Sequence, residues 1–276
     1  MTALRLGWRR GVILSRQSFS NGSELFSHVF WPLLMVGAVV FLRDRDFGAF
    51  SLGALAVPSI LGMNAAFGMV SLSQQLTADR EDGTLLRAKA TPRGVPAYLV
   101  GTLILVGGGL LADLAVFLVP AALLVPGLVT GGAGTWLVVA GLLALALAAT
   151  LPLGIVLGSV FGSPRAQGLL TLPILGLVAI SGIFYPIAAL PGWLQAVGQA
   201  FPFYWLGLGM RAALLPDAAV TVELGDSWRH LETVGVLSAW AVAGLSLSPI
   251  VLRRMARRES GSRVSARRAR ALQRVG

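Results

Sequence analysis

The sequence predicts an all-α integral membrane protein, a bundle of six transmembrane helices preceded by an amphipathic helix. Hydrophobic residues make up 55% of the chain, and the mean hydropathy is +0.78. A soluble domain cannot bury that much apolar surface, whereas helices in lipid need it. The apolar residues also gather in stretches of roughly 20, the length that crosses a hydrocarbon core of about 30 Å. We therefore expect one transmembrane domain over 1–252 and an arginine-rich cytoplasmic tail over 253–276.

The N-terminal segment, residues 1–22, differs from the apolar stretches that follow it. It combines four arginines with leucine, tryptophan and valine in the order MTALRLGWRRGVILSRQSFSNG. Such a mixture is typical of an amphipathic helix that lies along the membrane surface. The segment is too long for the basic region of a signal peptide, and no small-residue cleavage site follows the next apolar run. We expect it to form an interfacial helix.

Six stretches are long and apolar enough to cross the membrane. They cover about residues 26–42, 47–72, 97–125, 135–161, 169–185 and 234–252. Their orientation follows from the lysines and arginines, which gather in the cytoplasmic loops of membrane proteins. With the N-terminus inside, 18 of the 22 basic residues are cytoplasmic. Both termini are therefore expected in the cytoplasm.

The segment between the fifth and sixth stretches, residues 190–216, is apolar but broken. Pro191 and Pro202 divide it into pieces too short to cross a bilayer. Broken helices survive at membrane depth only where protein or water covers their free backbone groups. We expect two short re-entrant or interfacial helices on the outer side, and a simple amphipathic surface helix is the alternative.

The loop between the second and third stretches, residues 73–96, is a dense polar block in this apolar chain. A helix connection needs only about five residues, yet this one is longer and contains the patterned run DREDGTLLRAKATP over 79–92. Acidic residues come first, basic residues follow, and Pro92 ends the run, an order that suits a short helix. The block is either a solvated surface turn or a docking element for a partner.

Two motifs resemble those of the ABC-2 type transporter permeases. The run DREDGTLLRAKATP is similar to that family's stretch of Glu-Arg-Glu-x-Gly-Thr-Leu followed by Thr-Pro, with Asp79 in place of the first glutamate. Residues 181–215, SGIFYPIAALPGWLQAVGQAFPFYWLGLGMRAALL, are similar to its pattern of Ser-Gly, Leu-Pro-x-Trp-Leu-Gln and a late arginine, here Arg211. With the six stretches in the expected order, the resemblance extends over nearly the whole chain.

The resemblance implies where this chain meets its partner. In such permeases the loop between the second and third spans forms a coupling helix in a groove of a cytoplasmic ATPase subunit, which binds ATP and Mg²⁺. The matching ATPase-coupling residues are Asp79, Arg80, Glu81, Gly83, Thr84, Leu85 and Arg87. The resemblance also favours an outer gate near the broken segment. The aromatic residues expected there are Phe184, Tyr185, Trp193 and Phe201.

The same resemblance implies an assembly and a task. Two permease chains, identical or different, would combine with two ATPase subunits in a bacterial cell membrane. Their cargo would be hydrophobic or amphipathic, such as a drug, an antibiotic, a lipid or a lipid-linked glycan, and it would be exported.

The chain itself lacks the residues of an enzyme. A Walker A motif ends in Gly-Lys-Ser/Thr, but the only lysine, Lys89, follows Ala88. No cysteine, His-Glu-x-x-His run or carboxylate cluster is present. We expect no catalytic residue, cofactor or metal on this chain, and ATP hydrolysis by a separate polypeptide. The net charge of +10 fits anionic lipid near the tail rather than nucleic acid, because no nucleic-acid-binding motif accompanies the arginines.

A few polar and small residues within the expected spans are further candidates. Asp113 is the only ionisable residue well inside a span, and such residues either line a substrate path or bond to a neighbouring helix. Asn64 is a candidate for the same path, although a helix-to-helix hydrogen bond is the commoner use of such a residue. A ridge of small residues, Gly154, Gly158 and Gly162, allows close helix packing within one chain or across a dimer.

Two other classes of function remain open at this point. An ion-gradient-driven transporter would need several buried ionisable groups for coupling, and Asp113 stands alone. A membrane assembly protein without transport would leave the patterned loop over 79–92 unexplained.

Overall fold

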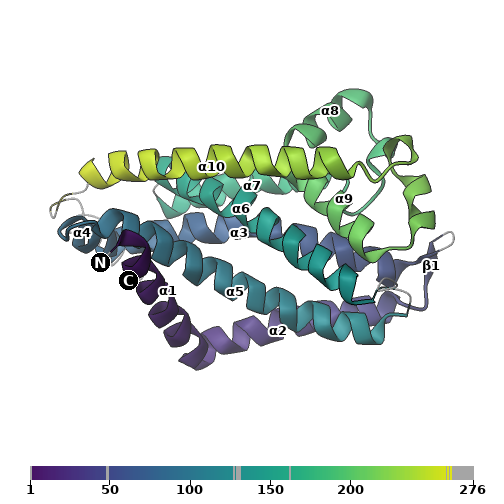
Figure 1. Cartoon of the computed structure of the whole chain (residues 1–276), viewed down its shortest axis with the longest axis horizontal. Coiled ribbons are helices and arrows are strands. Elements are labelled where there is room, and N and C mark those ends of the chain that lie inside the picture. Colours follow the sequence, from purple (N-terminus) through teal and green to yellow (C-terminus); the bar gives the residue numbers. More distant parts are fainter. Residues whose placement is uncertain are drawn as a thin grey trace.

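The computed structural model describes residues 2–47, 50–126, 128, 132–161, 163–258, 260 and 262. They form an elongated bundle of α-helices, as predicted (Figure 1). Within these residues, five helices are long and apolar enough to span a membrane. They are α2 (Gly22–Leu42), α3 (Leu52–Glu81), α5 (Gly94–Leu124), α6 (Gly132–Val160) and α10 (His230–Arg258). The chain is therefore a multi-pass membrane protein.

The fifth expected span corresponds to a shorter helix, α7 (Pro164–Ile180). Its 17 residues extend about 25 Å, slightly less than the hydrocarbon core. Ser163 caps its start by accepting a hydrogen bond from the Ala166 amide at 3.2 Å. The helix ends before Gly182, whose φ of +67° turns the chain. By its length alone, α7 is therefore less suited to span a membrane than the five longer helices.

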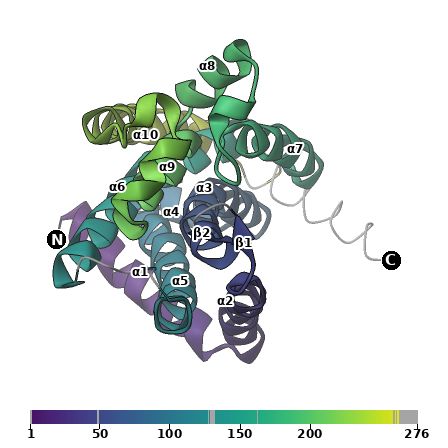
Figure 2. The same ribbon diagram turned by 90° about the vertical axis from the view of Figure 1, so that its right-hand side faces the viewer.

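Helix α3 lies at the centre of the bundle, with α2, α5, α6, α7 and α9 (Pro202–Leu214) around it (Figure 2). Small residues on α6 permit the close approach. A side chain at Gly158 would meet the Ser73 carbonyl oxygen at 2.9 Å, and one at Gly154 would collide with the Met69 carbonyl. These two glycines pack within one chain, while Gly162 lies outside the described residues.

The N-terminal helix α1 (Ala3–Ser20) packs along α5 and occupies most of the segment expected to be amphipathic. Gly7 and Gly11 are buried there because side chains at either position would overlap Val100 or Ile104 of α5. The rest of α1 exposes apolar side chains, among them Trp8, as well as basic ones such as Arg9. Helix α1 therefore packs on α5 through its glycines and leaves both apolar and basic side chains exposed.

The two ends of the bundle differ (Figure 1). One end, here called the α4 end, holds the short helix α4 (Thr84–Lys89) and the last turns of α10. Helix α10 continues past the expected boundary at Leu252 to Arg258, because Met255 and Ala256 are buried against the α4 region. Part of the expected tail is therefore an extension of the bundle.

The other end, here called the hairpin end, holds the shorter elements. Strands β1 (Asp46–Phe47) and β2 (Phe50–Ser51) pair antiparallel, with Asp46 opposite Ser51. The broken segment forms short pieces, in line with its prolines and glycines. They are α8 (Gly192–Ala200) and α9. Three short 3₁₀ helices flank them: η1 (Ile187–Ala189), η2 (Asp217–Val222) and η3 (Leu224–Asp226).

Candidate functional site

The polar block forms the junction between α3 and α4. Helix α3 ends at Glu81, and Gly83 then reverses the chain with a φ of +79°, a conformation in which glycine is unstrained. The Asp82 carboxylate accepts a hydrogen bond from the Thr84 amide at 2.7 Å. This bond satisfies one of the free amides at the start of α4. The motif's acid, glycine and threonine thus build a tight corner.

Helix α4 is anchored on its inner face. Leu85 is fully buried and Ala88 nearly so, in one cluster with Tyr98 of α5 and Leu252 of α10. The Lys89 ammonium donates a hydrogen bond to the Arg257 carbonyl of α10 at 3.2 Å. A displacement of α4 would therefore also displace α5 and α10, which contact it, as well as α3.

The seven residues expected to couple to an ATPase fall into two groups. Asp79, Gly83 and Leu85 are buried, whereas the other four are at least partly accessible at the α4 end. Arg87 is the most exposed, and its guanidinium donates to the Thr84 hydroxyl at 2.9 Å. A partner could touch the second group directly, while the first group shapes the corner from within.

Asp79 is the clearest member of the buried group. Its carboxylate accepts hydrogen bonds from the Tyr98 hydroxyl at 2.6 Å and from the Gln75 amide at 3.0 Å. The Arg10 guanidinium of α1 lies 4.8 Å from the centre of the Tyr98 ring, within range of a cation–π contact. Asp79 therefore connects α3 to α5 and, through Tyr98, to α1. The motif in the sequence indicates neither Tyr98 nor Arg10.

A second polar contact joins the first turn of α7 to α3. The Gln167 amide oxygen accepts from the Ser73 hydroxyl at 2.9 Å, and its nitrogen donates to the Thr77 hydroxyl at 3.1 Å. Gln167 is 5% exposed, so this network is shielded from solvent. The only signal in the sequence is a glutamine at the start of an apolar helix.

Asp113 lies on α5 beside His28 of α2, with 2.5 Å between the carboxylate oxygen Oδ1 and the imidazole Nδ1. Both side chains are partly accessible, at 29% and 23%. Gly109 of α5 allows the imidazole to lie close, because a side chain there would meet it at 3.2 Å. Sequence reasoning missed this partner, since 85 residues separate the two positions.

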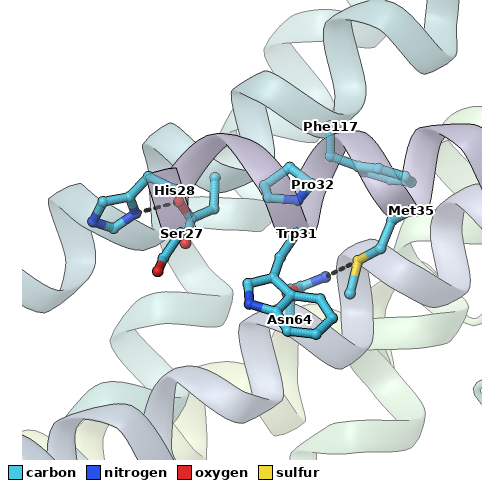
Figure 3. A pocket seen from close by; sticks show the side chains of 8 residues that line it. Ser27, His28, Trp31, Pro32, Met35, Asn64 and Phe117 are labelled. Carbon is cyan, nitrogen blue, oxygen red and sulfur yellow. Dashed lines mark hydrogen bonds and ion pairs between the residues drawn. The ribbon is translucent and has the colours of Figure 1, made fainter. Parts of the chain in front are cut away.

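Asn64 and Asp113 line one cavity with His28. Figure 3 shows Asn64 and His28 in this cavity from close by. Its volume is about 190 Å³. The lining residues are Ser27, His28, Trp31, Pro32, Met35, Asn64, Asp113 and Phe117. The Asn64 amide nitrogen donates to the Ile60 carbonyl at 2.9 Å within α3 and lies 3.8 Å from the Met35 sulfur of α2. Two of the intramembrane candidates are thus brought together.

The four aromatic residues expected at an outer gate lie outside the cavity of Asn64 and Asp113. None of them lines the cavity that holds Asn64 and Asp113. Phe184, Tyr185 and Trp193 have accessible rings, and the Tyr185 hydroxyl donates to the Ala179 carbonyl. Phe201 stacks on Trp240 of α10, with ring centres 6.0 Å apart.

A buried ion pair holds the same region together. Arg211 of α9 is 2.6 Å from Glu223, and its guanidinium also donates to the Gly182 and Ile183 carbonyls at 3.2 and 3.3 Å. The Ser59 hydroxyl of α3 donates to the same Ile183 carbonyl at 2.5 Å. These bonds attach α9 to the turn after α7 and to the central helix. A buried arginine needs such complete pairing.

In the part of the chain that the structure describes, no three His, Asp or Glu side chains gather as metal ligands do. A comparison with protein families finds one whose model, described as ABC-2 type transporter, matches residues 2–215. The match runs from α1 through the end of α9 and includes both sequence motifs. The comparison with curated proteins gives no match.

Proposed function

The chain belongs to the ABC-2 type transporter family, and from this premise we propose that it is the permease subunit of an ATP-driven exporter, coupled through α4 to a separate ATPase subunit. The family is that of the membrane-spanning, non-catalytic part of an ABC transporter and implies an ABC ATPase as partner. The chain has no Walker A motif. ATP and Mg²⁺ therefore belong on the partner.

The observation that carries this proposal is the build of the α4 end. Helix α4 exposes Arg87 while Leu85 and Ala88 fix it to the bundle. A short helix with an accessible polar face and a buried apolar face can receive a push and pass it on, because packed interiors move as units. Asp79, Gly83 and Leu85 would set the position of α4, and the exposed residues would contact the ATPase.

The proposal includes an arrangement in the membrane. Six spans, with α7 as the fifth, would place both termini and α4 in the cytoplasm and α8 and α9 at the outer face as re-entrant helices. The basic residues support this orientation, since 18 of 22 would then be cytoplasmic. Two permease chains and two ATPase subunits in a bacterial cell membrane would export a hydrophobic or amphipathic cargo past the aromatic residues near α8.

Family membership supports this function over the alternatives. A carrier driven by an ion gradient would need several buried ionisable groups for coupling. An assembly protein without transport would leave the loop pattern over 79–92 unexplained. The chain instead carries the loop pattern over 79–92 and the α4 helix that a coupled permease needs.

Charge reversal at Arg87 tests the coupling. Arg87→Glu should weaken binding of the ATPase about tenfold or more, because an ATPase surface that pairs with the Arg87 guanidinium would repel a carboxylate at the same position. Arg43→Glu, the same change at an exposed arginine of the hairpin end, is the matched control and should leave binding unchanged. A photo-crosslinking residue at position 87 should join the chain to a polypeptide with a Walker A motif, identified by mass spectrometry.

Two results would contradict the proposal. One is a position-87 crosslink in native membranes that reaches no such polypeptide. The other is equal ATPase binding by wild type and Arg87→Glu while both proteins insert into the membrane at the same level.

A further inference from the structure

The His28–Asp113 pair stands between two cavities. The first is the cavity with Asn64. The second, of about 200 Å³, is lined on its polar side by Ser15, Ser18, Glu24, Ser71 and Gln75. Ser71 and Gln75 follow Asn64 on α3 by two to three turns, so the second cavity lies closer to the α4 end. Both cavities reach the pair, and only the pair is common to them.

The first cavity has the chemistry of a site for organic cations. Asp113 is its only carboxylate, and its walls carry the rings of Trp31 and Phe117 (Figure 3). Aromatic faces attract cations, most strongly where water is scarce. No lysine or arginine lines the cavity. With a neutral imidazole at His28, the site carries one net negative charge.

We propose that this cavity binds the ammonium end of a hydrophobic organic cation, with Asp113 as counter-ion, and that a proton on His28 competes with this cation. The inference rests on the proposed function and names the class of cargo. A volume of about 190 Å³ holds a compact head group rather than a whole drug-sized molecule. The apolar remainder of such a cargo would extend along α2, whose outer face exposes Leu34 and Phe41.

Competition follows from the charges around the pair. A protonated His28 would neutralise Asp113 and remove the net charge that attracts the cation. Glu24, on the same helix as His28, is the only other titratable group that lines either cavity. It is engaged by the Ser18 hydroxyl and the Asn21 amide. Facing groups from α1 and α3 are uncharged serines and Gln75, and the Phe19 ring is tilted against the imidazole with ring centres 5.1 Å apart.

The second cavity supplies a route for the proton. Its serines, Glu24 and Gln75 offer the several polar partners that a buried water requires, and its volume exceeds that of a single water. The proton would therefore reach His28 from the side of the α4 end, while the cation occupies the opposite side of the pair. Cargo affinity should therefore fall as the pH is lowered, because more protons then compete with the cation for the pair.

Equilibrium dialysis of the full chain in lipid nanodiscs tests the proposal, with radiolabelled phenyltrimethylammonium as probe and empty nanodiscs as blank. Binding at about pH 8 should be displaced by unlabelled probe and not by benzenesulfonate, an anion of comparable size. The probe's affinity should drop at least about tenfold as the pH falls to about 5.

Four variants separate the roles of the residues. Asp113→Asn should weaken binding about tenfold or more, while Asp113→Glu, which keeps the charge, should stay within about threefold of wild type. His28→Gln should bind at about pH 8 and lose the pH dependence. Asp44→Asn, which removes an exposed carboxylate at the hairpin end and lies outside both cavities, is the matched control and should change neither affinity nor pH profile. Monodisperse size-exclusion profiles and unfolding temperatures establish that each variant is folded.

Several results would overturn the inference. They are wild-type affinity in folded Asp113→Asn, displacement by benzenesulfonate, a flat pH profile in wild type, or tighter binding at low pH. If Asp113→Asn does not fold, His28→Gln and the pH profile decide. The dialysis assay contains no ATPase. If the probe does not bind as expected while an ATPase is still crosslinked at position 87, only the cation site is rejected. Cation binding without any ATPase partner would sink the exporter proposal instead.

Discussion

At the scale of single residues, the polar block divides by burial rather than by position in the motif. Asp79 and Arg87 lie eight residues apart in one family pattern, yet Asp79 is 7% exposed and bonded to Tyr98 while Arg87 faces outward. A buried carboxylate that accepts two hydrogen bonds holds elements together. An exposed guanidinium remains available to a partner.

Tyr98→Phe tests the structural role of Asp79. Removing the hydroxyl leaves a buried carboxylate short of a partner, which should cost about 1–3 kcal/mol of stability and lower the unfolding temperature by several degrees. Tyr185→Phe is the matched control, because the Tyr185 side chain is accessible and water can replace its bond. An unchanged unfolding temperature in Tyr98→Phe would mean that water reaches Asp79.

At the scale of helices, small residues decide which elements touch. Gly158 of α6 faces the Ser73 backbone of α3, and Gly7 and Gly11 bring α1 against α5. Lipid tails are as apolar as leucine, so close van der Waals contact rather than the hydrophobic effect drives helix association in membranes. The position of α3 at the centre of the bundle follows from such contacts.

Gly158→Leu should therefore disrupt the contact between α3 and α6. The leucine would overlap backbone atoms of Ser73 that cannot move aside, and the overlap should lower the free energy of unfolding by about 1–3 kcal/mol or more. Gly141→Leu, on the same helix, faces open space and should leave stability near that of wild type. Thermal unfolding of both proteins in one detergent checks this. Equal unfolding temperatures in the two variants would show that α3 and α6 accommodate the leucine without a loss of packing.

At the scale of the whole molecule, the segment from η1 to α9 distinguishes the proposed topology from its rivals. A seventh crossing there would move the nine arginines from Arg253 to Arg274 to the outside and break the excess of basic residues inside. The pieces α8 and α9 have nine and 13 residues, both too short to cross alone. The buried Arg211–Glu223 pair fastens α9 to the bundle at this end.

Cysteine labelling tests the orientation without background, since the chain has no cysteine. Single cysteines at Ala189, Ser227 and Ser262 all occupy accessible positions. A membrane-impermeant thiol reagent added to intact cells should label positions 189 and 227 and should miss position 262 until the cells are opened. Labelling at 262 from outside would reverse the topology and remove α4 from the cytoplasm.

The elements that could be predicted from the sequence are those set by local pattern. The apolar stretches correspond to α2, α3, α5, α6 and α10, the arginine-rich start corresponds to α1, and DREDGTLLRAKATP contains α4. Boundaries differ where packing extends a helix, as at the end of α10. The fifth span is the weakest case, because Gly182 ends α7 after 17 residues.

By itself, the sequence determined the all-α membrane class, the approximate place of each long helix and, through two motifs, the family. These depend on length, charge and residue order, which are properties of consecutive residues. Only the tertiary structure decided that Asp79 turns inward to Tyr98, that His28 meets Asp113, and that Asn64 shares their cavity. Each residue rotates a helix by about 100°, so which side chains face each other depends on how two helices pack. That packing is settled by close contacts between distant segments, such as Gly109 beside His28, and no run of consecutive residues records it.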